Sequence, residues 1–310
     1  MPVTTERLPT YFISHGGGPW PYMMAQSNGM YDRLAQSLRD MTRQLGERPK
    51  AVLVISAHWE EREFTVMAAE RPPMVYDYAG FPEHTYHVQY LAPGLPALAE
   101  QARQLIQSAG FSALLDAQRG FDHGSFAPLV AMYPLADVPV VQLSLRAGYD
   151  PAEHLAVGRA LAPLREQGVL IVGSGLSYDN MRRMGPSAAV PSKQFDDWLQ
   201  QTLITTEPHQ REQRLIDWQD APAARVAHPQ EDHLLPLMMA VGMMKPCACT
   251  TRKASLAASP TPASGSARKA GSEWRWLAGP VGACRRRGVA GYPRGRCTAT
   301  NDEVRRRRTA

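Results

Sequence analysis

Two histidines stand at the ends of apolar runs, where side chains of this type can bind a metal ion. His15 follows the run at 10–14, and His58 follows the run at 51–57. Ligands of α/β sheets bind just beyond the carboxyl ends of the strands, and neutral imidazole is the commonest metal ligand. If the two strands are neighbours, both imidazoles face one crevice. The pair is equally compatible with a metal site and with structural roles, so further ligands must decide.

A third candidate ligand lies in the segment HPQEDHLLPL. It contains His228, Glu231, Asp232 and His233 at the start of an apolar helix. A catalytic metal site needs at least three protein ligands and an open position. The two acidic residues also suit the first turn of a helix, where they interact favourably with the helix dipole. His233 has less reason to stand beside the apolar run, which makes it the third candidate ligand.

Two further residues are candidates for the same site. His123 is predicted in a loop before the apolar stretch FAPLVAMY, where it either transfers protons near neutral pH or bridges loops. Asp179 follows the apolar run at 169–175. Ser174, in the same run, lacks the G-x-S-x-G spacing of a nucleophile elbow.

The remaining histidines receive no functional assignment. His84 and His87 lie in a polar segment, and we expect His154 and His209 on exposed faces of helices.

Strand and helix patterns alternate along most of the chain. Near-continuous apolar runs, typical of strands covered on both faces, occupy 10–14, 51–57, 138–145 and 169–175. Helical patterns occupy 30–46, 95–110, 150–168, 192–206, 210–220 and 231–244. We therefore predict a single α/β domain whose central sheet, mostly parallel or mixed, is flanked by helices. Gly16, Gly17 and Gly18 should turn the chain after His15 and leave space for ligands beside it.

Composition indicates a globular protein. Of 310 residues, 44% are hydrophobic, no apolar run is long enough to span a membrane, and the N-terminus lacks the apolar core of a leader peptide. We expect a cytoplasmic protein that does not act at a membrane. The four cysteines, all beyond residue 244, match no paired zinc-ligand spacing and give no reason to expect a disulfide framework.

The charge changes sharply at residue 245. Residues 1–244 carry 19 Lys/Arg and 26 Asp/Glu, whereas residues 245–310 carry 15 and 3. The latter segment is rich in Gly, Pro, Ser and Ala without a sustained period, so we predict a catalytic domain at 1–244 and a basic, unstructured tail at 245–310. Translation out of the natural reading frame is an alternative origin. Aromatic residues are sparse in the tail and no recognition motif accompanies its arginines, so we expect no specific nucleic-acid partner.

Six ordered motifs resemble one protein family. They are SHGGGPW, SAHWE, YDYAGFPEHTYHVQYLAPG, GFDHGSFAPLVAMYP with VPVVQLSL, GSGLSYDNMR and HPQEDHLLPL. Together they resemble the class III, LigB-type extradiol ring-cleavage dioxygenases, in the branch similar to DOPA 4,5-dioxygenases. The resemblance covers residues 8–244 and is specific for the family but not for the substrate.

The resemblance implies a non-haem Fe(II) enzyme that opens the ring of a catechol-type substrate with O2 to give a semialdehyde. Zinc often occupies the site in isolated members. Residue by residue, His15, His58 and His233 fall on the metal-binding histidines of the family. His123 falls on a pocket histidine that interacts with substrate or oxygen, and Asp179 on a further ligand or acid/base.

The chain departs from the family at two places. Family members typically have histidine where Asp179 stands. This carboxylate could complete a histidine and carboxylate ligand set, deprotonate a catechol, or lower activity, because an unperturbed pKa of about 3.9 makes it a weaker base than imidazole. Nothing after Lys245 resembles the final strand of the family, and an uncovered sheet edge favours self-association, so a homo-oligomer is compatible with the sequence.

Two other functions fit the same residues. One is a zinc-dependent hydrolase, in which metal-bound water is the nucleophile. The other is a non-catalytic metal-binding or partner-binding protein on this scaffold, which Asp179 and the altered C-terminus would favour. The sequence also does not choose the catechol. The aromatic residues Trp59, Tyr76, Tyr78, Phe81 and Tyr86 either line an aromatic pocket or pack in the core.

Overall fold

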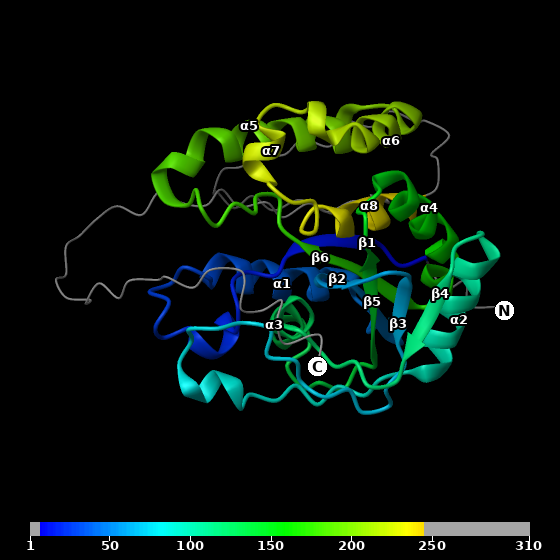
Figure 1. Cartoon of the computed structure of the whole chain (residues 1–310). Helices are drawn as coiled ribbons and strands as arrows, with labels where there is room; N and C mark the ends of the chain where they lie inside the picture. Colours follow the sequence, from blue (N-terminus) through cyan, green and yellow to red (C-terminus); the bar gives the residue numbers. More distant parts are fainter. Residues whose placement is uncertain (1–6, 245–310) are drawn as a thin grey trace, which may run out of the picture.

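The computed structural model describes residues 7–244, so the predicted tail at 245–310 lies outside the described residues. Within them, six strands form one sheet in the order β1-β6-β2-β5-β3-β4 (Figure 1). The strands are β1 (Thr10–Ser14), β2 (Ala51–Glu61), β3 (Phe64–Met67), β4 (Ala113–Asp116), β5 (Val140–Arg146) and β6 (Val169–Gly175). Neighbouring strands are parallel except β3 and β5, which are antiparallel. The predicted α/β fold with a mostly parallel, mixed sheet is confirmed.

Helices cover both faces of the sheet (Figure 1). The α-helices are α1 (Asp32–Leu45), α2 (Pro96–Ser108), α3 (His123–Met132), α4 (Pro151–Leu161), α5 (Ala189–Gln200), α6 (Pro208–Ile216), α7 (Ala224–Ala227) and α8 (Leu235–Gly242). Shorter helical turns are η1 (Trp20–Met23), η2 (Glu83–Tyr86), η3 (Ala162–Gln167), η4 (Gly185–Ala188), η5 (Gln201–Thr205) and η6 (Trp218–Asp220). Helices α5, α6 and α7 form an outer layer beyond α4 and α8.

The continuous apolar pattern of β2 follows from these two covered faces. Leu53 and Ile55 pack in one core with α2, α4 and α8, whereas Val52 and Val54 pack in a second core with α1 and α3. Because successive side chains of a strand point to opposite faces, a strand between two layers must be apolar at every position. The runs predicted as strands are those of β1, β2, β5 and β6.

Two strands were not predicted from the sequence. β3 and β4 have four residues each, and β4 lies at the edge of the sheet with Leu114 and Leu115 exposed. Such short segments give neither a long apolar run nor a clear alternation.

The prediction that His123 lies in a loop was wrong, because His123 is the first residue of α3. Asp122 caps this helix, and its side chain accepts a hydrogen bond from Ser125 N at 3.0 Å. Helix α3 is buried almost throughout and contains Pro128. A buried helix shows no amphipathic period, which is why the pattern did not reveal it.

The expectation that His154 is exposed was also wrong. This residue of α4 is fully buried because α4 packs between α2, α6 and α8. Arg146 N donates to His154 Nε2 at 3.3 Å, and Nδ1 lies 2.7 Å from Asp150 O. Both ring nitrogens are therefore hydrogen-bonded to backbone atoms. His209, by contrast, is exposed as expected.

Among residues 7–244, none of the helices is both long enough and apolar enough to cross a membrane.

Candidate metal centre

Three elements bring His15, His58 and His233 together. His15 follows β1, and His233 lies in the turn before α8. His58 lies within β2, which continues four residues beyond the predicted run. Between the pairs Ile55↔Leu143 and Glu60↔Leu145, β2 contains three residues more than β5, so the strand bulges at His58. Strands β1 and β2 are not neighbours, because β6 lies between them, yet the two imidazoles still meet.

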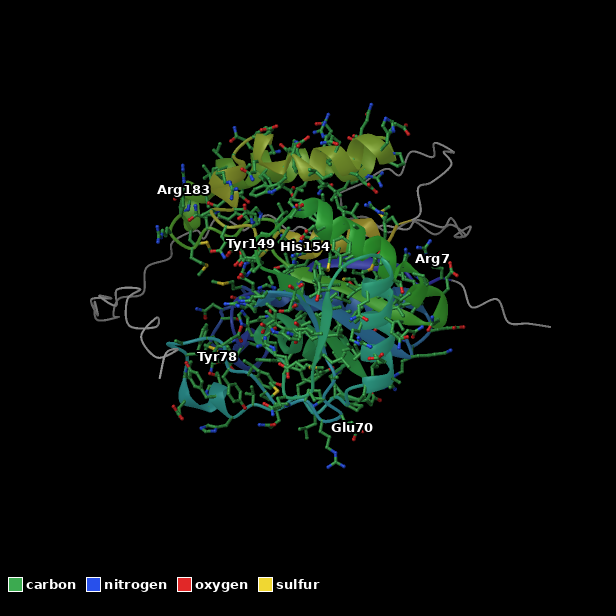
Figure 2. The ribbon with its side chains drawn as sticks, turned by 45° about the vertical axis from the view of Figure 1, so that its right-hand side comes forward. Arg7, Glu70, Tyr78, Tyr149, His154 and Arg183 are labelled. Atoms are coloured by element: carbon green, nitrogen blue, oxygen red, sulfur yellow. The ribbon has the colours of Figure 1, made fainter. Side chains whose placement is uncertain are left out.

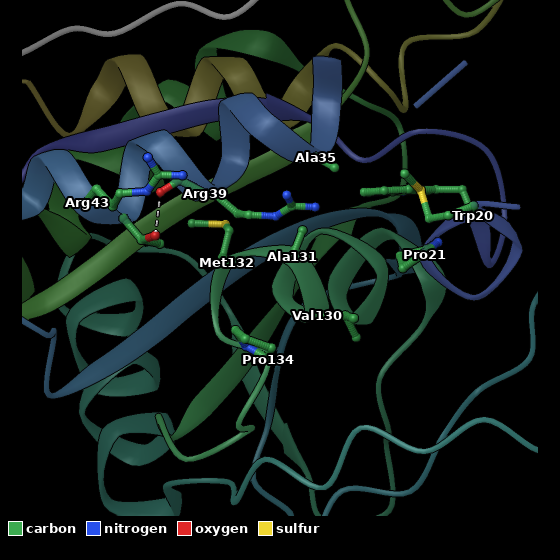
Figure 3. A pocket seen from close by; sticks show the side chains of 11 residues that line it. Trp20, Pro21, Ala35, Arg39, Arg43, Val130, Ala131, Met132 and Pro134 are labelled. Carbon is green, nitrogen blue, oxygen red and sulfur yellow. Dashed lines mark hydrogen bonds between the residues drawn. The ribbon is translucent and has the colours of Figure 1, made fainter. Parts of the chain in front are cut away.

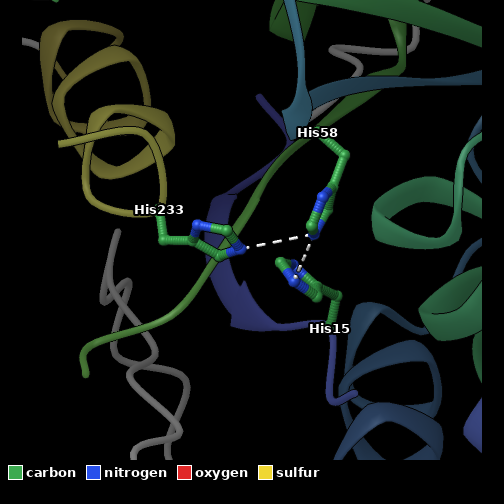
Figure 4. Close-up of side chains that lie close together, drawn as sticks. All are labelled: His15, His58 and His233. Atoms are coloured by element: carbon green, nitrogen blue, oxygen red, sulfur yellow. Dashed lines mark hydrogen bonds between the residues drawn. The ribbon is translucent and has the colours of Figure 1, made fainter. Parts of the chain in front are cut away.

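The Nε2 atoms of the three imidazoles face one another (Figure 4). His58 Nε2 lies 3.1 Å from His15 Nε2 and 3.3 Å from His233 Nε2. The described residues thus contain a group of three histidines that could hold a metal ion.

Glycines permit the close approach of the elements behind this cluster. A Cβ atom at Gly175, the last residue of β6, would lie 2.1 Å from the carbonyl oxygen of His233. Leu176 N donates to the same oxygen at 3.0 Å. A larger residue at Gly175 would therefore push His233 away from the sheet.

The Nδ1 partner of His15 fixes its tautomer. Ser174 Oγ donates its only proton to Gly124 O and lies 3.2 Å from His15 Nδ1. A hydroxyl whose proton is already used can only accept, so the proton of His15 is on Nδ1. The lone pair of His15 is then on Nε2, toward the cluster.

Carboxylates lie behind the other two imidazoles. His233 Nδ1 is 3.1 Å from Asp179 Oδ2 and 3.1 Å from Asp232 Oδ1. His58 Nδ1 is 3.5 Å from Asp77 Oδ2. Negative charge beside Nδ1 favours a proton there and raises the basicity of Nε2.

The donor set fits a metal ion. At metal–nitrogen bonds of about 2.1 Å, ligand nitrogens are about 3.0 to 3.4 Å apart for right to tetrahedral angles. The observed 3.1 and 3.3 Å fall in this range. Three lone pairs directed at one point repel one another unless a cation lies between them. Fe(II) and Zn(II) both accept imidazole ligands, and three protein ligands leave positions open.

The electrostatics keep the imidazoles of His15 and His58 neutral. Burial, and then the neighbouring histidines His58, His233 and His123, hold the pKa of His15 well below its ordinary value. Burial, followed by His123 and His233, lowers the pKa of His58 to about 3. Because only neutral imidazole binds a metal, these shifts leave His15 and His58 ready to bind one at neutral pH.

His123 stands beside the three histidines. Its ring centroid is 3.9 Å from that of His58 and 5.4 Å from that of His15. Its Nδ1 is hydrogen-bonded to Asp77 Oδ2 at 2.9 Å. Although burial raises the pKa of Asp77, the hydrogen bonds from His123 hold it below its ordinary value. His123 thus has a carboxylate behind it, the arrangement of a general acid/base histidine.

A comparison with known protein families agrees with this arrangement. Residues 9–267 match the family described as the catalytic LigB subunit of aromatic ring-opening dioxygenase. The chain belongs to the LigB family.

Relatives of this LigB protein carry names of the same activity. A protein named 4,5-DOPA dioxygenase extradiol from Beta vulgaris is 37% identical over 240 residues, covering 75% of this chain and 85% of the relative. One of the same name from Escherichia coli (strain K12) is 36% identical over 245 residues, covering 77% and 86%. The crystal structure of an uncharacterized protein from Escherichia coli K12 matches with a TM-score of 0.55 and 33% identity, covering 67% of this chain and 81% of the other.

Asp179 of this LigB protein does not face the centre of the cluster. Its carboxylate lies against Nδ1 of His233, on the side of the ring opposite the shared Nε2. Burial raises the pKa of Asp179, while His233 opposes the rise. Asp179 N donates to Ala227 O at 2.9 Å, and Asn180 Nδ2 to Val226 O at 2.8 Å, which ties its loop to the chain before His233.

Sequence reasoning missed the residues behind the ligands. The sequence pattern assigns no positioning role to Asp77 or Ser174, and it indicates Asp232 mainly as a residue of the first turn of a helix. Asp77 lies in a coil segment 46 residues from its partner His123, so no local spacing could reveal the pair. His228, a weaker candidate in the sequence, lies apart from the cluster, with its ring 5.1 Å from Phe195 and 6.0 Å from Trp218.

The glycines after His15 turn the chain as predicted, with positive φ at Gly16 and Gly18. The space beside them is filled by aromatic rings rather than left for ligands. A Cβ at Gly16 would lie 2.6 Å from Trp20, and one at Gly18 would lie 2.5 Å from Phe81.

Four of the five predicted aromatic residues form a cluster next to His123. Tyr78, labelled in Figure 2, lies 5.9 Å from His123 between ring centroids and contacts the other three, Tyr76, Phe81 and Tyr86. Trp59 lies elsewhere, with the guanidinium of Arg119 stacked 4.8 Å from its ring.

A separate cavity of about 390 Å³ lies among η1, α1 and α3 (Figure 3). Trp20, Arg39 and Met132 are among its lining residues, but none of the histidines is. Trp20 connects this cavity to the candidate centre, because its Nε1 donates to His15 O at 2.7 Å.

Proposed function

We propose that this protein is an Fe(II)-dependent extradiol dioxygenase that opens the ring of a catechol-type substrate with O2 and gives a semialdehyde. The observation that carries the proposal is the convergence of His15, His58 and His233 through Nε2, with His123 alongside. The names of the relatives make DOPA the first catechol to test.

His15, His58 and His233 are the proposed ligands. All three are neutral side chains, so together they leave the full positive charge of a divalent ion available to a catecholate. Fe(II) in this position would supply the electronic coupling between the catechol and O2. Zn(II) would occupy the same donors in isolated protein without that redox chemistry.

His123 is the proposed catalytic acid/base. A catechol must lose hydroxyl protons as it binds a metal, and a nearby imidazole with its lone pair free can accept one. The Asp77 carboxylate at 2.9 Å would stabilise the imidazolium that forms. The aromatic cluster around Tyr78 lies on the same side as His123, where it suits a flat aromatic substrate.

Asp179 acts on the site through His233 in this proposal. Its carboxylate contacts the Nδ1 of a ligand, the position from which a second carboxylate, that of Asp232, also acts. Such partners orient the ring and strengthen the ligand. The proton transfers are then left to His123.

The direct test is anaerobic reconstitution with Fe(II), followed by a panel of catechols that includes DOPA. Oxygen uptake and the visible absorbance of a semialdehyde are measured together. We expect equal amounts of oxygen consumed and ring opened, and no turnover in His58→Ala. The matched control is His209→Ala, because His209 is exposed on α6, a helix that contributes no residue to the group of three histidines.

The zinc-hydrolase alternative predicts the opposite pattern. Hydrolysis of a test ester or amide by the zinc protein, with no oxygen uptake by the iron protein on any catechol, would overturn the proposal. A protein that binds metal but is inert in both assays, and that gains ring-opening activity in Asp179→His, would favour the non-catalytic alternative.

A further inference from the structure

We infer that Asp77 is a positioning residue that holds the proton of His123 on Nδ1 and so leaves the lone pair on Nε2. The inference deepens the proposed function, on which its catalytic consequence rests, but its structural test requires no turnover.

Asp77 binds His123 at two points. Asp77 Oδ1 accepts from the backbone N of His123 at 3.0 Å, and Oδ2 is hydrogen-bonded to Nδ1 at 2.9 Å. His123 is the first residue of α3, so its N–H has no partner within the helix. One carboxylate therefore fixes the backbone and the ring of the same residue.

The segment that carries Asp77 is itself anchored. Val75 N donates to Phe121 O at 2.8 Å, and Phe121 N donates to Pro73 O at 2.8 Å. On the other side of Asp77, Tyr78 Oη donates to Thr85 O at 2.6 Å. These bonds anchor the chain on both sides of Asp77. The position of its carboxylate is therefore set by the fold and not only by its contact with His123.

The charge of Asp77 is directed at histidines. The nearby Asp122 carboxylate is paired with Arg119 at 2.7 Å and accepts from Ser56 and Gln142. Asp77 forms no comparable pair with Lys or Arg within the described chain, and the groups that act on it are His123 and His58. The contact with His58 Nδ1, at 3.5 Å, is longer than a hydrogen bond.

Asp77→Asn should reverse the tautomer of His123. The backbone N–H of His123 can only donate, so the amide oxygen must face it. The amide nitrogen then faces Nδ1 and can only donate as well. Nδ1 must become the acceptor, which moves the ring proton to Nε2 and removes the lone pair from the site.

The test is the tautomer of His123, measured by two-bond ¹H–¹⁵N correlations in zinc-loaded protein and assigned by loss of the signals in His123→Gln. We expect Nδ1–H in the parent and Nε2–H in Asp77→Asn. Nε2–H in the parent, or Nδ1–H in both, would overturn the inference. The parent measurement alone remains decisive if the variant does not fold.

The matched control is Glu83→Gln. It makes the same carboxylate-to-amide change at a carboxylate–histidine pair on the same segment, because Glu83 Oε1 lies 3.1 Å from the exposed His87 Nε2. It should leave the tautomer of His123 unchanged. A change in this control would assign the effect to the segment as a whole and overturn the inference.

Kinetics give the catalytic consequence. In the Fe(II) protein, Asp77→Asn should lower kcat by about 10²- to 10⁴-fold with little change in KM. The affinity for Zn(II) should fall by less than the roughly 10-fold loss expected when a partner of a metal ligand is removed. A larger loss would mean that Asp77 acts mainly on His58, and would overturn the assignment to His123. If no catechol is opened by the parent, the proposed function fails while the tautomer result still decides the inference.

Discussion

Buried histidines occur in two different settings in this molecule. At the candidate centre, His15, His58 and His233 each have a partner behind Nδ1 and turn Nε2 toward one another. Away from it, His154 uses both ring nitrogens on the backbone, and His228 packs beside Phe195 and Trp218. Burial lowers the pKa in both settings, to about 4 for His154 and about 3 for His228.

The comparison shows that neither burial nor a shifted pKa marks a functional histidine here. The difference lies in the free nitrogen. A metal-ligand histidine keeps one ring nitrogen without a hydrogen bond to the protein and directs its lone pair at a point shared with other ligands. A structural histidine uses its ring nitrogens in hydrogen bonds, or buries them away from any other candidate ligand. The following experiments test this distinction.

The largest effect is expected from His58→Ala. Removing the ligand whose Nε2 contacts both others should weaken Zn(II) binding by more than about 100-fold, beyond the loss typical for an outer partner. Chelator competition measures the affinity. His154→Gln, a change at an equally buried histidine, should leave metal affinity unchanged. Similar losses in both variants would contradict the distinction.

His123→Ala should separate catalysis from metal binding. Without its proton-accepting imidazole, kcat on the best catechol should fall by about 10²- to 10⁴-fold. Zn(II) affinity should stay close to that of the parent, because His123 contributes no ring nitrogen to the group formed by His15, His58 and His233. Loss of metal together with activity would make His123 a ligand instead.

Asp179→Asn should weaken metal binding by about 10- to 100-fold, since it removes one of two negative charges beside Nδ1 of His233. Chelator competition again measures the change, with Asp197→Asn as a control at an exposed carboxylate of α5. An unchanged affinity would remove Asp179 from the set of positioning residues.

The smallest effect concerns stability and pH at His228. Its folded pKa of about 3 lies below the unfolded value of about 6.5, so below pH 6.5 protons bind the unfolded chain preferentially. Between pH 7 and 5, the free energy of unfolding of the parent should therefore fall by about 2 kcal/mol more than that of His228→Phe. Urea unfolding of both proteins at pH 7, 6 and 5 tests this. Parallel losses would show that His228 is not a buried neutral group.

The sequence predicted the elements whose apolar pattern is long. β1, β2, β5 and β6 and helices α1, α2 and α4 were all visible as runs or periods. β4 was not, because four residues at a partly exposed edge carry no pattern, and α3 was not, because a helix buried on all sides has no polar face. His15 and His58 were predicted from strand ends, but His154 was misplaced because its contacts with Phe64 and with the backbone of Arg146 arise only in the folded chain.

The sequence by itself determined which side chains could bind a metal and which elements carry them, since residue type and strand ends are local properties. Only the tertiary structure decided which nitrogen of each imidazole is free. Ser174 and Asp77 lie 159 and 46 residues from the imidazoles of His15 and His123, and Asp179 lies 54 residues from that of His233. A proton is fixed by the donor or acceptor that reaches it in space, and such contacts arise only when the sheet and its crossing loops are assembled.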